Sequence, residues 1–467
     1  MSAHFTPANI ASWCDGTLVQ GDPNTQLLGL SIDTRTVRDG QLFAAIVGPN
    51  HDAHAYLAEA TSAGASALLI AKGREDSISS EIAIPVIAVA DTTRGIQDLA
   101  AAHRQRFAGT VVGLTGSSGK TTTKEMTASV LSTAGPCLKT QGNLNNEYGV
   151  PLTLLSREDT HTRAVVEMGM NHRGEIARLA EIAKPDIALV TNVGTAHIEY
   201  LGSQTEIAAE KGDLFAALGA SGIAVANWDD KNVREQSARA PAEVISFGMS
   251  PDACVRASDV RFADDGFYEF TLTAPAGSTS VRIGGLGDTT IINALAAAAV
   301  GVACELSLDQ IANGLADYEG IAGRMSKKAI AGDITLIDDT YNANPQSMQA
   351  AIASVASLAS KGRAIAVLGA MAELGDNAAQ AHLDTGKQVF KTGVSLLVAV
   401  GKRAAGIAEG AIAAGMAKEN VKRVEGPEAA CNALKSELQP GDWVLVKGSR
   451  AARMERIVET LCSEEPR

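Results

Sequence analysis

The sequence predicts an α/β protein built from three domains. A chain of 467 residues is too long for one hydrophobic core. Aromatic residues make up only 4% of the chain while glycine occurs 45 times, which favours parallel strands packed by helices over a β-sandwich. Short apolar runs also alternate with helical patterns. We expect a small N-terminal α/β domain (1–90), a central phosphate-loop mononucleotide-binding domain with added antiparallel strands (91–322) and a C-terminal Rossmann-like, doubly wound domain (323–467).

The composition excludes several classes of protein. A net charge of −13 argues against nonspecific nucleic-acid binding. The first residues lack the basic start and apolar core of a signal peptide, and the longest apolar run, 291–304, is too short to cross a bilayer. Six scattered cysteines without metal-ligand spacing are typical of reduced thiols. We therefore expect a cytoplasmic protein with no membrane span and no nucleic-acid partner.

In the N-terminal domain, apolar strand-like pieces (27–32, 41–47, 67–70 and 85–90) surround a helical pattern over 55–66. One of the strands ends in polar residues: Ser31, Asp33, Thr34 and Arg35. Ligands of α/β sheets bind at strand ends, so these side chains are candidate substrate contacts. A surface turn that holds an ion pair between Asp33 and Arg35 explains the same residues.

The central domain begins with a predicted helix over 92–107 and then carries the strongest motif of the chain. An apolar strand, 111–115, runs into a glycine-rich turn, and a helix to Leu131 leaves it; the motif residues are Gly116, Ser117, Ser118, Gly119, Lys120, Thr121 and Thr122. Backbone N–H groups, a helix N-terminus and an ammonium can all meet a triphosphate there. The common phosphate loop has a further glycine where this chain has Leu114, so the motif is the shorter G-x-x-G-K-T. The alternative is a glycine turn that binds nothing.

Two later strands of this domain end in side chains suited to a metal ion. Glu167 closes the run 164–169, and His197 follows the run 187–192. A carboxylate and an imidazole beside a triphosphate fit Mg²⁺, although a single histidine after a strand is often structural. Between the phosphate loop and these strands lie three asparagines that are either turn residues or substrate donors: Asn143, Asn145 and Asn146.

The rest of the central domain is less informative. A helix over 203–218 contains Glu210, Lys211 and Asp213, which by themselves indicate a solvated charge cluster. A strand over 222–228 follows, and alternation over 260–272 and 278–283 then indicates antiparallel strands. Helices around Asn293 and over 308–318 close the domain, and Gly320–Gly323 is a plausible hinge.

The C-terminal domain repeats strand and helix: 334–338 then 346–360, 364–368 then 377–390, 395–400 then 403–414, and 443–446 before a final helix. This pattern is doubly wound α/β, but it lacks the glycine fingerprint of a dinucleotide site, so NAD is not expected. Polar clusters at three strand ends, 338–345, 369–375 and 447–450, favour a site at one edge of the sheet.

These motifs resemble those of the ATP-dependent Mur ligases of peptidoglycan synthesis. The resemblance spans all three domains and is carried by 115–122, 143–151, 167–169, 192–197 with Glu199, Lys211, 338–348, 371–375 and 447–450. The last three motifs are similar to those of family members that add D-alanyl-D-alanine to UDP-N-acetylmuramoyl-tripeptide. The chain departs from the family pattern at Ala53, Thr289, Thr290 and Ala370, which affects expected contacts to adenine and to uridine.

The resemblance implies roles for individual residues. Lys120 and the amides around Gly116 and Gly119 are expected to hold the ATP phosphates, Thr121 and Glu167 one Mg²⁺, and His197 a second. Lys211 matches the family's carbamylated lysine, a carbamate being a small anion able to meet Mg²⁺. Asn293, Arg324 and Asp339 match nucleotide contacts, and 31–35 resembles the uridine-diphosphate site. Substrate contacts are also expected from Asn143, Asn145, Asn146, Tyr341, Asn344, Lys447, Ser449 and Arg450.

The expected reaction is ATP-dependent amide formation through an acyl phosphate, by a monomer whose partners are the two substrates. Two alternatives stay open. A ligase similar to folylpolyglutamate synthase shares the phosphate loop and the lysine but has no counterpart of residues 1–90. A nucleotide-gated binding protein would hydrolyse ATP slowly and without regard to amino-acid substrates.

Overall fold

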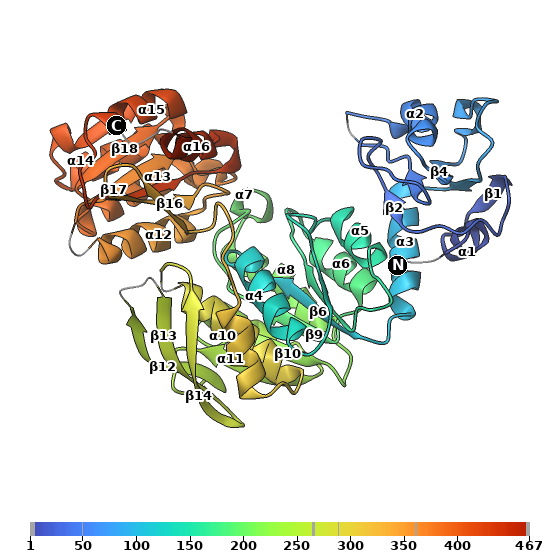
Figure 1. The fold of residues 1–467 in the computed structure, drawn as a ribbon, viewed down its shortest axis with the longest axis horizontal. Helices are drawn as coiled ribbons and strands as arrows, with labels where there is room; N and C mark the ends of the chain where they lie inside the picture. Colours follow the sequence, from blue (N-terminus) through green and yellow to red (C-terminus); the bar gives the residue numbers. More distant parts are fainter. Residues whose placement is uncertain (1–4, 49, 264–266, 288, 360–361, 464–467) are drawn as a thin grey trace.

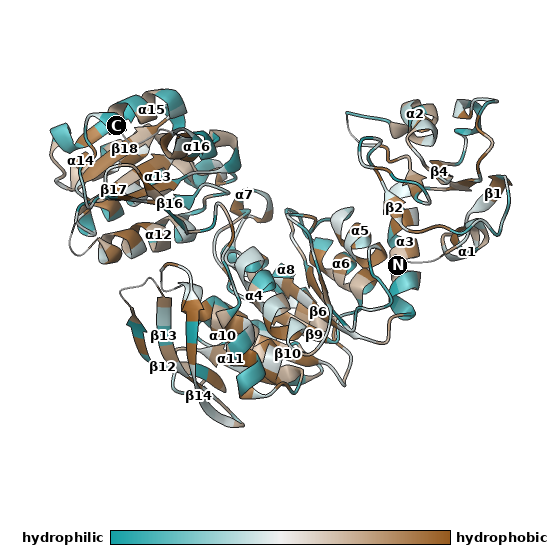
Figure 2. Cartoon of the chain, viewed as in Figure 1, coloured by the Kyte–Doolittle hydropathy of each residue, from teal (hydrophilic) through white to brown (hydrophobic). Residues whose placement is uncertain are grey.

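Three sheets, joined in chain order, form the protein (Figure 1). A computed structural model describes residues 5–48, 50–263, 267–287, 289–359 and 362–463. The N-terminal and C-terminal domains stand as two arms on the central domain (Figure 1). Apolar residues concentrate in the strands and on the inward faces of the helices, and polar residues on the outer surfaces (Figure 2). No helix of the described residues is long and apolar enough to cross a membrane.

The N-terminal domain holds a five-stranded sheet in the order β1-β5-β4-β3-β2, parallel except for β1. Its elements are α1 (Pro7–Trp13), β1 (Thr17–Gln20), β2 (Leu30–Ser31), β3 (Leu42–Ala44), α2 (Leu57–Ser62), β4 (Ala67–Ala71) and β5 (Val86–Val89). The helix predicted to Ser66 ends four residues earlier, because Gly64 turns the chain with a φ of +114°. The short α1 and β1 were not predicted.

Helix α3 (Thr92–Gln105) joins the N-terminal and central domains. Its buried Ile96 and Leu99 lie in one hydrophobic cluster that runs from the N-terminal sheet to the central sheet. Arg104, on its last turn, is 9% exposed and ties the helix to the central domain. The guanidinium donates 2.9 Å hydrogen bonds to the carbonyls of Ala183 and Lys184 and to Asp186. The helix is therefore anchored by both apolar packing and a buried cation.

The central sheet has nine strands in the order β14-β13-β12-β11-β10-β9-β6-β8-β7. Its parallel part comprises β6 (Thr110–Thr115), β7 (Cys137–Lys139), β8 (Arg163–Glu167), β9 (Ile187–Val190), β10 (Ile223–Asn227) and β11 (Glu243–Gly248). Strand β6 pairs with β8 on one side and β9 on the other. The segments that follow these three strands consequently meet at one edge of the sheet.

Helices cover both faces of this parallel part. Val112 and Leu114 of β6 pack in the cluster of α4 (Lys120–Ser132), α10 (Thr289–Ala303) and α11 (Leu308–Ala316), while Val111 packs in the opposite one. The remaining helices are α5 (Gly149–Leu155), α6 (Glu175–Ala183), α7 (Ile198–Leu201), α8 (Gln204–Ala216) and α9 (Lys231–Ser237). Buried strands of this kind carry apolar residues on both faces, which is why they were recognisable as continuous apolar runs.

The predicted antiparallel extension is present. The alternating stretch 260–272 comprises the end of β12 (Val255–Phe262) and most of β13 (Phe267–Ala274), which pair antiparallel and are followed by β14 (Gly277–Gly284). Alternation is typical of both strands, so periodicity alone does not separate them.

The C-terminal sheet has the order β15-β16-β20-β17-β18-β19, parallel except for β15. Its elements are β15 (Ser326–Ile330), β16 (Ile334–Asp339), α12 (Pro345–Leu358), β17 (Ala364–Gly369), α13 (Ala378–Lys391), β18 (Leu396–Val400), α14 (Ala405–Ala414), β19 (Val421–Val424), α15 (Pro427–Lys435), β20 (Trp443–Lys447) and α16 (Glu455–Ser463). The edge strands β15 and β19 were not predicted, since edge strands are half exposed and carry few apolar residues. Ser360, the predicted end of α12, lies outside the described residues.

Removing the Arg104 anchor should destabilise the junction between the first two domains. We expect Arg104→Met to lower the free energy of unfolding by about 2–4 kcal/mol, because charge-assisted hydrogen bonds are lost and the buried carbonyl of Ala183 stays unpaired. Urea denaturation followed by circular dichroism measures this change. Arg94→Met is the matched control, since Arg94 is exposed on the same helix and, among the described residues, its guanidinium pairs only with Asp98. Equal stability of the two variants would contradict an anchoring role.

Candidate active site

The phosphate loop connects β6 to α4, and its two glycines are required by close neighbours. A Cβ on Gly116 would lie 1.9 Å from Oγ1 of Thr191, and one on Gly119 would lie 2.6 Å from Oδ1 of Asn293. Gly119 also has a φ of +76°, which L-residues rarely adopt. The ammonium of Lys120 bends back over the loop and donates to the Gly116 carbonyl at 2.8 Å. The loop backbone and the Lys120 ammonium therefore lie next to the same cavity.

Asn192, which directly follows β9, holds the phosphate loop in shape. Its Oδ1 accepts from the backbone N–H of Ser118 at 3.0 Å and lies 3.1 Å from the Ser118 hydroxyl, while its Nδ2 donates to the Ser118 carbonyl. Ser117 in turn donates its N–H to the Asn192 carbonyl. Asn192 was not among the predicted site residues. The signal for it was its place at the carboxyl end of a strand next to β6.

Glu167, at the end of β8, carries an unpartnered carboxylate oxygen. The residue is 1% exposed, and its Oε1 accepts from Nδ2 of Asn145 at 2.8 Å. Its Oε2 is enclosed and has no hydrogen-bond partner in the described part of the chain. Buried polar atoms are rarely left unpaired, and a hard divalent cation satisfies such an oxygen. The described residues hold no group of three metal-ligating acidic, histidine or cysteine side chains, so an ion there needs phosphate or water oxygens as well.

The three predicted asparagines have different surroundings, and one of them has a role that the sequence did not suggest. Asn145 positions Glu167, as described above. Asn146 is a turn residue, because its Oδ1 accepts from the N–H groups of Tyr148 and Gly149 at the start of α5. Asn143 is exposed and lines the cavity described below.

Lys211 is buried in α8 with 2% of its surface exposed, so the solvated charge cluster expected there was wrong. No hydrogen bond or ion pair of its ammonium occurs among the described residues. Burial, together with the charge of Lys120, lowers the pKa of Lys211 well below its usual value, and Glu210 opposes this only weakly. The Glu210 carboxylate is already engaged, because it accepts the N–H groups of Gly174 and Ile176 at the start of α6.

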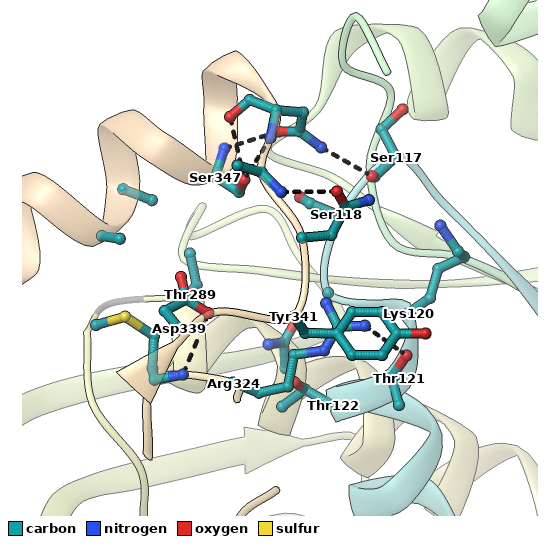
Figure 3. A pocket seen from close by; sticks show the side chains of 18 of the residues that line it. Ser117, Ser118, Lys120, Thr121, Thr122, Thr289, Arg324, Asp339, Tyr341 and Ser347 are labelled. Atoms are coloured by element: carbon teal, nitrogen blue, oxygen red, sulfur yellow. Dashed lines mark hydrogen bonds between the residues drawn. The ribbon is translucent and has the colours of Figure 1, made fainter. Parts of the chain in front are cut away.

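A cavity of about 830 Å³ lies between the phosphate loop and the C-terminal domain (Figure 3). Predicted residues that line it are Ser117, Ser118, Gly119, Lys120, Thr121, Thr122, Asn143, Asn145, Asn146, Glu167, His197, Asn293, Arg324, Asp339, Tyr341, Asn344 and Lys447. Central and C-terminal residues therefore share one space, in which His197 lies 2.7 Å from Glu373 of the C-terminal domain. Glu373 was noted in a polar loop of the sequence but was not predicted as a site residue.

One wall of the cavity is built where the chain enters the C-terminal domain. The Arg324 guanidinium stacks 3.9 Å from the centre of the Tyr341 ring and donates to the Thr121 hydroxyl at 3.2 Å (Figure 3). Asp339 accepts from the Met325 N–H and, at 2.6 Å, from the buried Lys447 ammonium. The charge of the Lys447 ammonium is thereby balanced by the Asp339 carboxylate, and the contact holds Asp339 in place.

The remaining predicted residues lie elsewhere. In the N-terminal domain, Arg35 pairs with Asp33 at 2.6 Å and lowers the pKa of Asp33 to about 2, Ser31 bonds within the same turn, and Thr34 donates to Glu59. None of these four lines the cavity. Ser449 is buried, and the exposed Arg450 pairs with Glu455 at 3.2 Å. Neither of them lines the cavity.

The four departures from the family pattern are also located. Thr289 and Thr290 line the cavity, and the hydroxyl of Thr290 donates to the Leu286 carbonyl. Ala370 accepts the N–H of Ser449 through its carbonyl, and Ala53 begins a short 3₁₀ turn.

Comparison with known proteins gives a consistent result. Residues 114–301 match the model of the Mur ligase middle domain, and residues 323–450 that of the Mur ligase, glutamate ligase domain. The UDP-N-acetylmuramoyl-tripeptide–D-alanyl-D-alanine ligase of Escherichia coli K12 is 38% identical over 92% of this chain and 93% of its own length.

Two solved structures are also similar to this chain. A crystal structure of MurF from Acinetobacter baumannii superposes with a TM-score of 0.89 at 32% identity, over 99% of this chain and 100% of that one. MurF ligase from Thermotoga maritima, solved in complex with ADP, has a TM-score of 0.81 at 29% identity and covers 93% and 96%.

A methyl group at Gly119 should disturb the phosphate loop. We expect Gly119→Ala to weaken nucleotide binding about tenfold or more, or ~1.4 kcal/mol, because the new Cβ displaces Asn293 and the residue keeps a positive φ. Isothermal titration with ADP measures the affinity. Gly393→Ala controls for backbone strain, since Gly393 has a φ of +78° but no atom within 4 Å of its Cβ position. Unchanged affinity in Gly119→Ala would remove the loop from the nucleotide site.

Proposed function

The chain belongs to the Mur ligase family, and on that premise we propose that it joins D-alanyl-D-alanine to UDP-N-acetylmuramoyl-tripeptide, forming the pentapeptide precursor of peptidoglycan with conversion of ATP to ADP and phosphate. The observation that carries the proposal is the shared cavity. It brings the phosphate loop, with Lys120 and Glu167, against polar strand ends of a second domain. A ligase needs such a space because nucleotide, carboxylate and amine must meet in one place.

The reaction follows from the chemistry of the two substrates. A carboxylate is a poor acceptor for an amine, because oxide is a poor leaving group. Transfer of the ATP γ-phosphoryl group to the tripeptide carboxylate gives an acyl phosphate, which the dipeptide amine then attacks with release of phosphate. Lys120 and the loop amides hold the β- and γ-phosphates and offset the charge that develops on them. The C-terminal domain lines one side of the cavity, and its closure would exclude water that hydrolyses the acyl phosphate.

Two Mg²⁺ ions are part of the proposal. The unpartnered Glu167 oxygen and the Thr121 hydroxyl fit one of them, and the His197 imidazole fits a second. When bound, the ions supply charge neutralisation along the phosphate chain. Glu167 accepts a hydrogen bond from Asn145, and the Thr121 hydroxyl accepts one from Arg324, so both side chains are oriented by the protein.

We also propose that Lys211 is carbamylated. A carbamate forms when the neutral amine attacks CO₂ and loses a proton, and a lowered pKa makes that amine available. The product is an anion in a place where an unpaired ammonium is costly, and it lies close enough to Lys120 for their charges to interact. The carbamate would therefore stabilise both the buried side chain of Lys211 and the nearby Lys120 cation.

Substrate contacts are assigned by position. Arg324, Asp339 and Asn293 are proposed for the nucleotide, while Asn143, Tyr341 and Asn344 are proposed for the peptide substrates. The turn that contains Ser31 and Arg35 is proposed for the uridine diphosphate, and Ser449 and Arg450 for the dipeptide. We also propose that the protein acts as a monomer. Reduced cysteines and the use of ATP favour the cytoplasm.

The two alternatives receive less support. Residues 1–90 are nearly a fifth of the chain, so an alignment with the E. coli ligase over 92% of it must extend into the N-terminal domain. A folylpolyglutamate-synthase-like enzyme was expected to lack this part. A nucleotide-gated binding protein has no need for a cavity that a second domain closes over its phosphate loop.

Phosphate release tests the function directly. We expect release from ATP only when both UDP-N-acetylmuramoyl-tripeptide and D-alanyl-D-alanine are present, together with a product whose mass equals the pentapeptide. Each substrate is omitted in turn, and glutamate with a folate replaces them as a control. Phosphate release that is indifferent to both substrates would refute the ligase proposal and support the binding protein.

Lys211 variants test the carbamate. We expect Lys211→Ala to reduce kcat about 100-fold or more, the usual scale for loss of a single electrostatic stabiliser. Added formate should restore part of that activity, because it can occupy the space of the carbamate. Lys211→Met is the matched control, since its side chain fills that space and leaves no room for formate.

The wild-type protein gives an independent measurement of the same group. Removal of CO₂ from the buffer should lower its activity reversibly, and ¹³C-labelled bicarbonate should give a carbamate NMR signal that Lys211→Met lacks. Full activity without CO₂ and no rescue of Lys211→Ala would contradict carbamylation.

A further inference from the structure

A single charged pair connects a proposed metal ligand to the opposite domain. His197 follows β9 of the central domain, and Glu373 lies on the loop after β17 of the C-terminal domain. Nδ1 of His197 and Oε2 of Glu373 are 2.7 Å apart. Both side chains line the large cavity. The pair therefore exists only while the two domains are in contact.

The backbone at both ends of the pair is in the left-handed region. His197 has a φ of +65° and Glu373 a φ of +59°, and neither residue is glycine. Non-glycine residues in this region cost about 1 kcal/mol or more each and cluster at functional sites. Both residues of the pair therefore have an unfavourable backbone conformation, and they face each other across the domain contact.

The two nitrogens of the imidazole have different surroundings. Nδ1 is enclosed, and its close polar neighbour is the Glu373 carboxylate oxygen at 2.7 Å, an ion-pair contact without a hydrogen bond in the described structure. No hydrogen bond of Nε2 occurs among the described residues, and the ring lines the cavity. A carboxylate beside Nδ1 favours the tautomer that carries its proton on Nδ1.

The pair is not needed to hold the domains together. Gln346 of α12 contacts the hydroxyl of Thr195 at 3.1 Å, and Asn344 donates to the Ser117 carbonyl at 3.3 Å. The side chain of Glu373 is 44% exposed, so its contribution to the interface is small. A carboxylate on one ring nitrogen is, however, the usual device that fixes the tautomer and direction of a metal-binding histidine.

We propose that Glu373 is a positioning residue that holds His197 through Nδ1 and leaves Nε2 facing the phosphate cavity, so that closure of the C-terminal domain completes the site. The inference rests on the proposed function, in which His197 serves the phosphates of ATP. It adds that the ligand set of the central domain depends on a residue of the other domain. Nucleotide can then bind to the open enzyme, while phosphoryl transfer waits for closure, when water is excluded.

Glu373→Gln tests the proposal, with Asp376→Asn as matched control. Asp376 is exposed on the same loop, and Asp376→Asn removes the same charge; in the described structure Asp376 has no hydrogen bond or ion pair with His197. In the full-length enzyme, we expect Glu373→Gln to reduce kcat about 10–100-fold, the usual scale for losing such a partner, with KM for ATP within about twofold. Asp376→Asn should change neither value.

A second measurement does not depend on activity. The chain has eight histidines, so ¹⁵N-histidine labelling with a His197→Asn variant for assignment resolves the ring of His197. We expect the Nδ1–H tautomer in the wild type with ADP, a mixture of tautomers in Glu373→Gln, and weaker Mn²⁺ binding to the ADP complex of that variant.

The outcomes separate this inference from the proposed function. An unchanged tautomer in Glu373→Gln, or an equal kcat loss in Asp376→Asn, would overturn the role of Glu373 even if the wild type ligates both substrates. A wild type that releases phosphate without either substrate would instead refute the proposed function, while the tautomer measurement would still report on the pair. Thermal unfolding of both variants checks that the fold is unchanged.

Discussion

The parallel pairing of β6 with β8 and β9 is the constraint on which the site depends. Parallel neighbours end at the same edge of a sheet, so the phosphate loop after β6 lies between Glu167 at the end of β8 and Asn192 at the end of β9. The side-chain amide of Asn192 then holds the backbone of Ser118, because its oxygen accepts from the Ser118 N–H and its nitrogen donates to the Ser118 carbonyl. Two N–H groups of the loop, those of Ser117 and Ser118, donate to Asn192, so the neighbouring strand end fixes the shape of the loop.

The second feature of the site is the burial of charged side chains without ion pairs, which lowers the stability of the protein. Glu167 and Lys211 are both almost fully buried, and among the described residues neither side chain forms an ion pair. The nearest anion to Lys211 in sequence, Glu210, is fully used by the start of α6, where the helix dipole favours it. Burying charged groups without partners lowers stability. Their persistence here is understandable if ATP, Mg²⁺ and a carbamate provide the missing partners, and the protein thereby stays ready for a highly charged ligand.

Contacts between the central and C-terminal domains complete the site. The C-terminal domain adds Asn344, Gln346 and Glu373 at the rim of the cavity, each in contact with a loop of the central domain. The wall formed by Arg324, Tyr341 and Asp339 lies where the chain passes between the domains, so both domains contribute to this side of the cavity.

The sequence by itself determined the three-domain α/β fold, because buried parallel strands are recognisable as apolar runs and the phosphate loop has a fixed spacing of Gly116, Gly119 and Lys120. Local signals were weaker where exposure hides the pattern, as in β15 and β19, or where one alternating stretch contains parts of two strands, as at 260–272. Only the tertiary structure decided that Lys211 is buried rather than solvated and that Asn145 supports Glu167. It alone also brought Glu373 to His197. The physical reason is that burial and pairing of a charge depend on atoms far along the chain, which spacing within one segment does not specify.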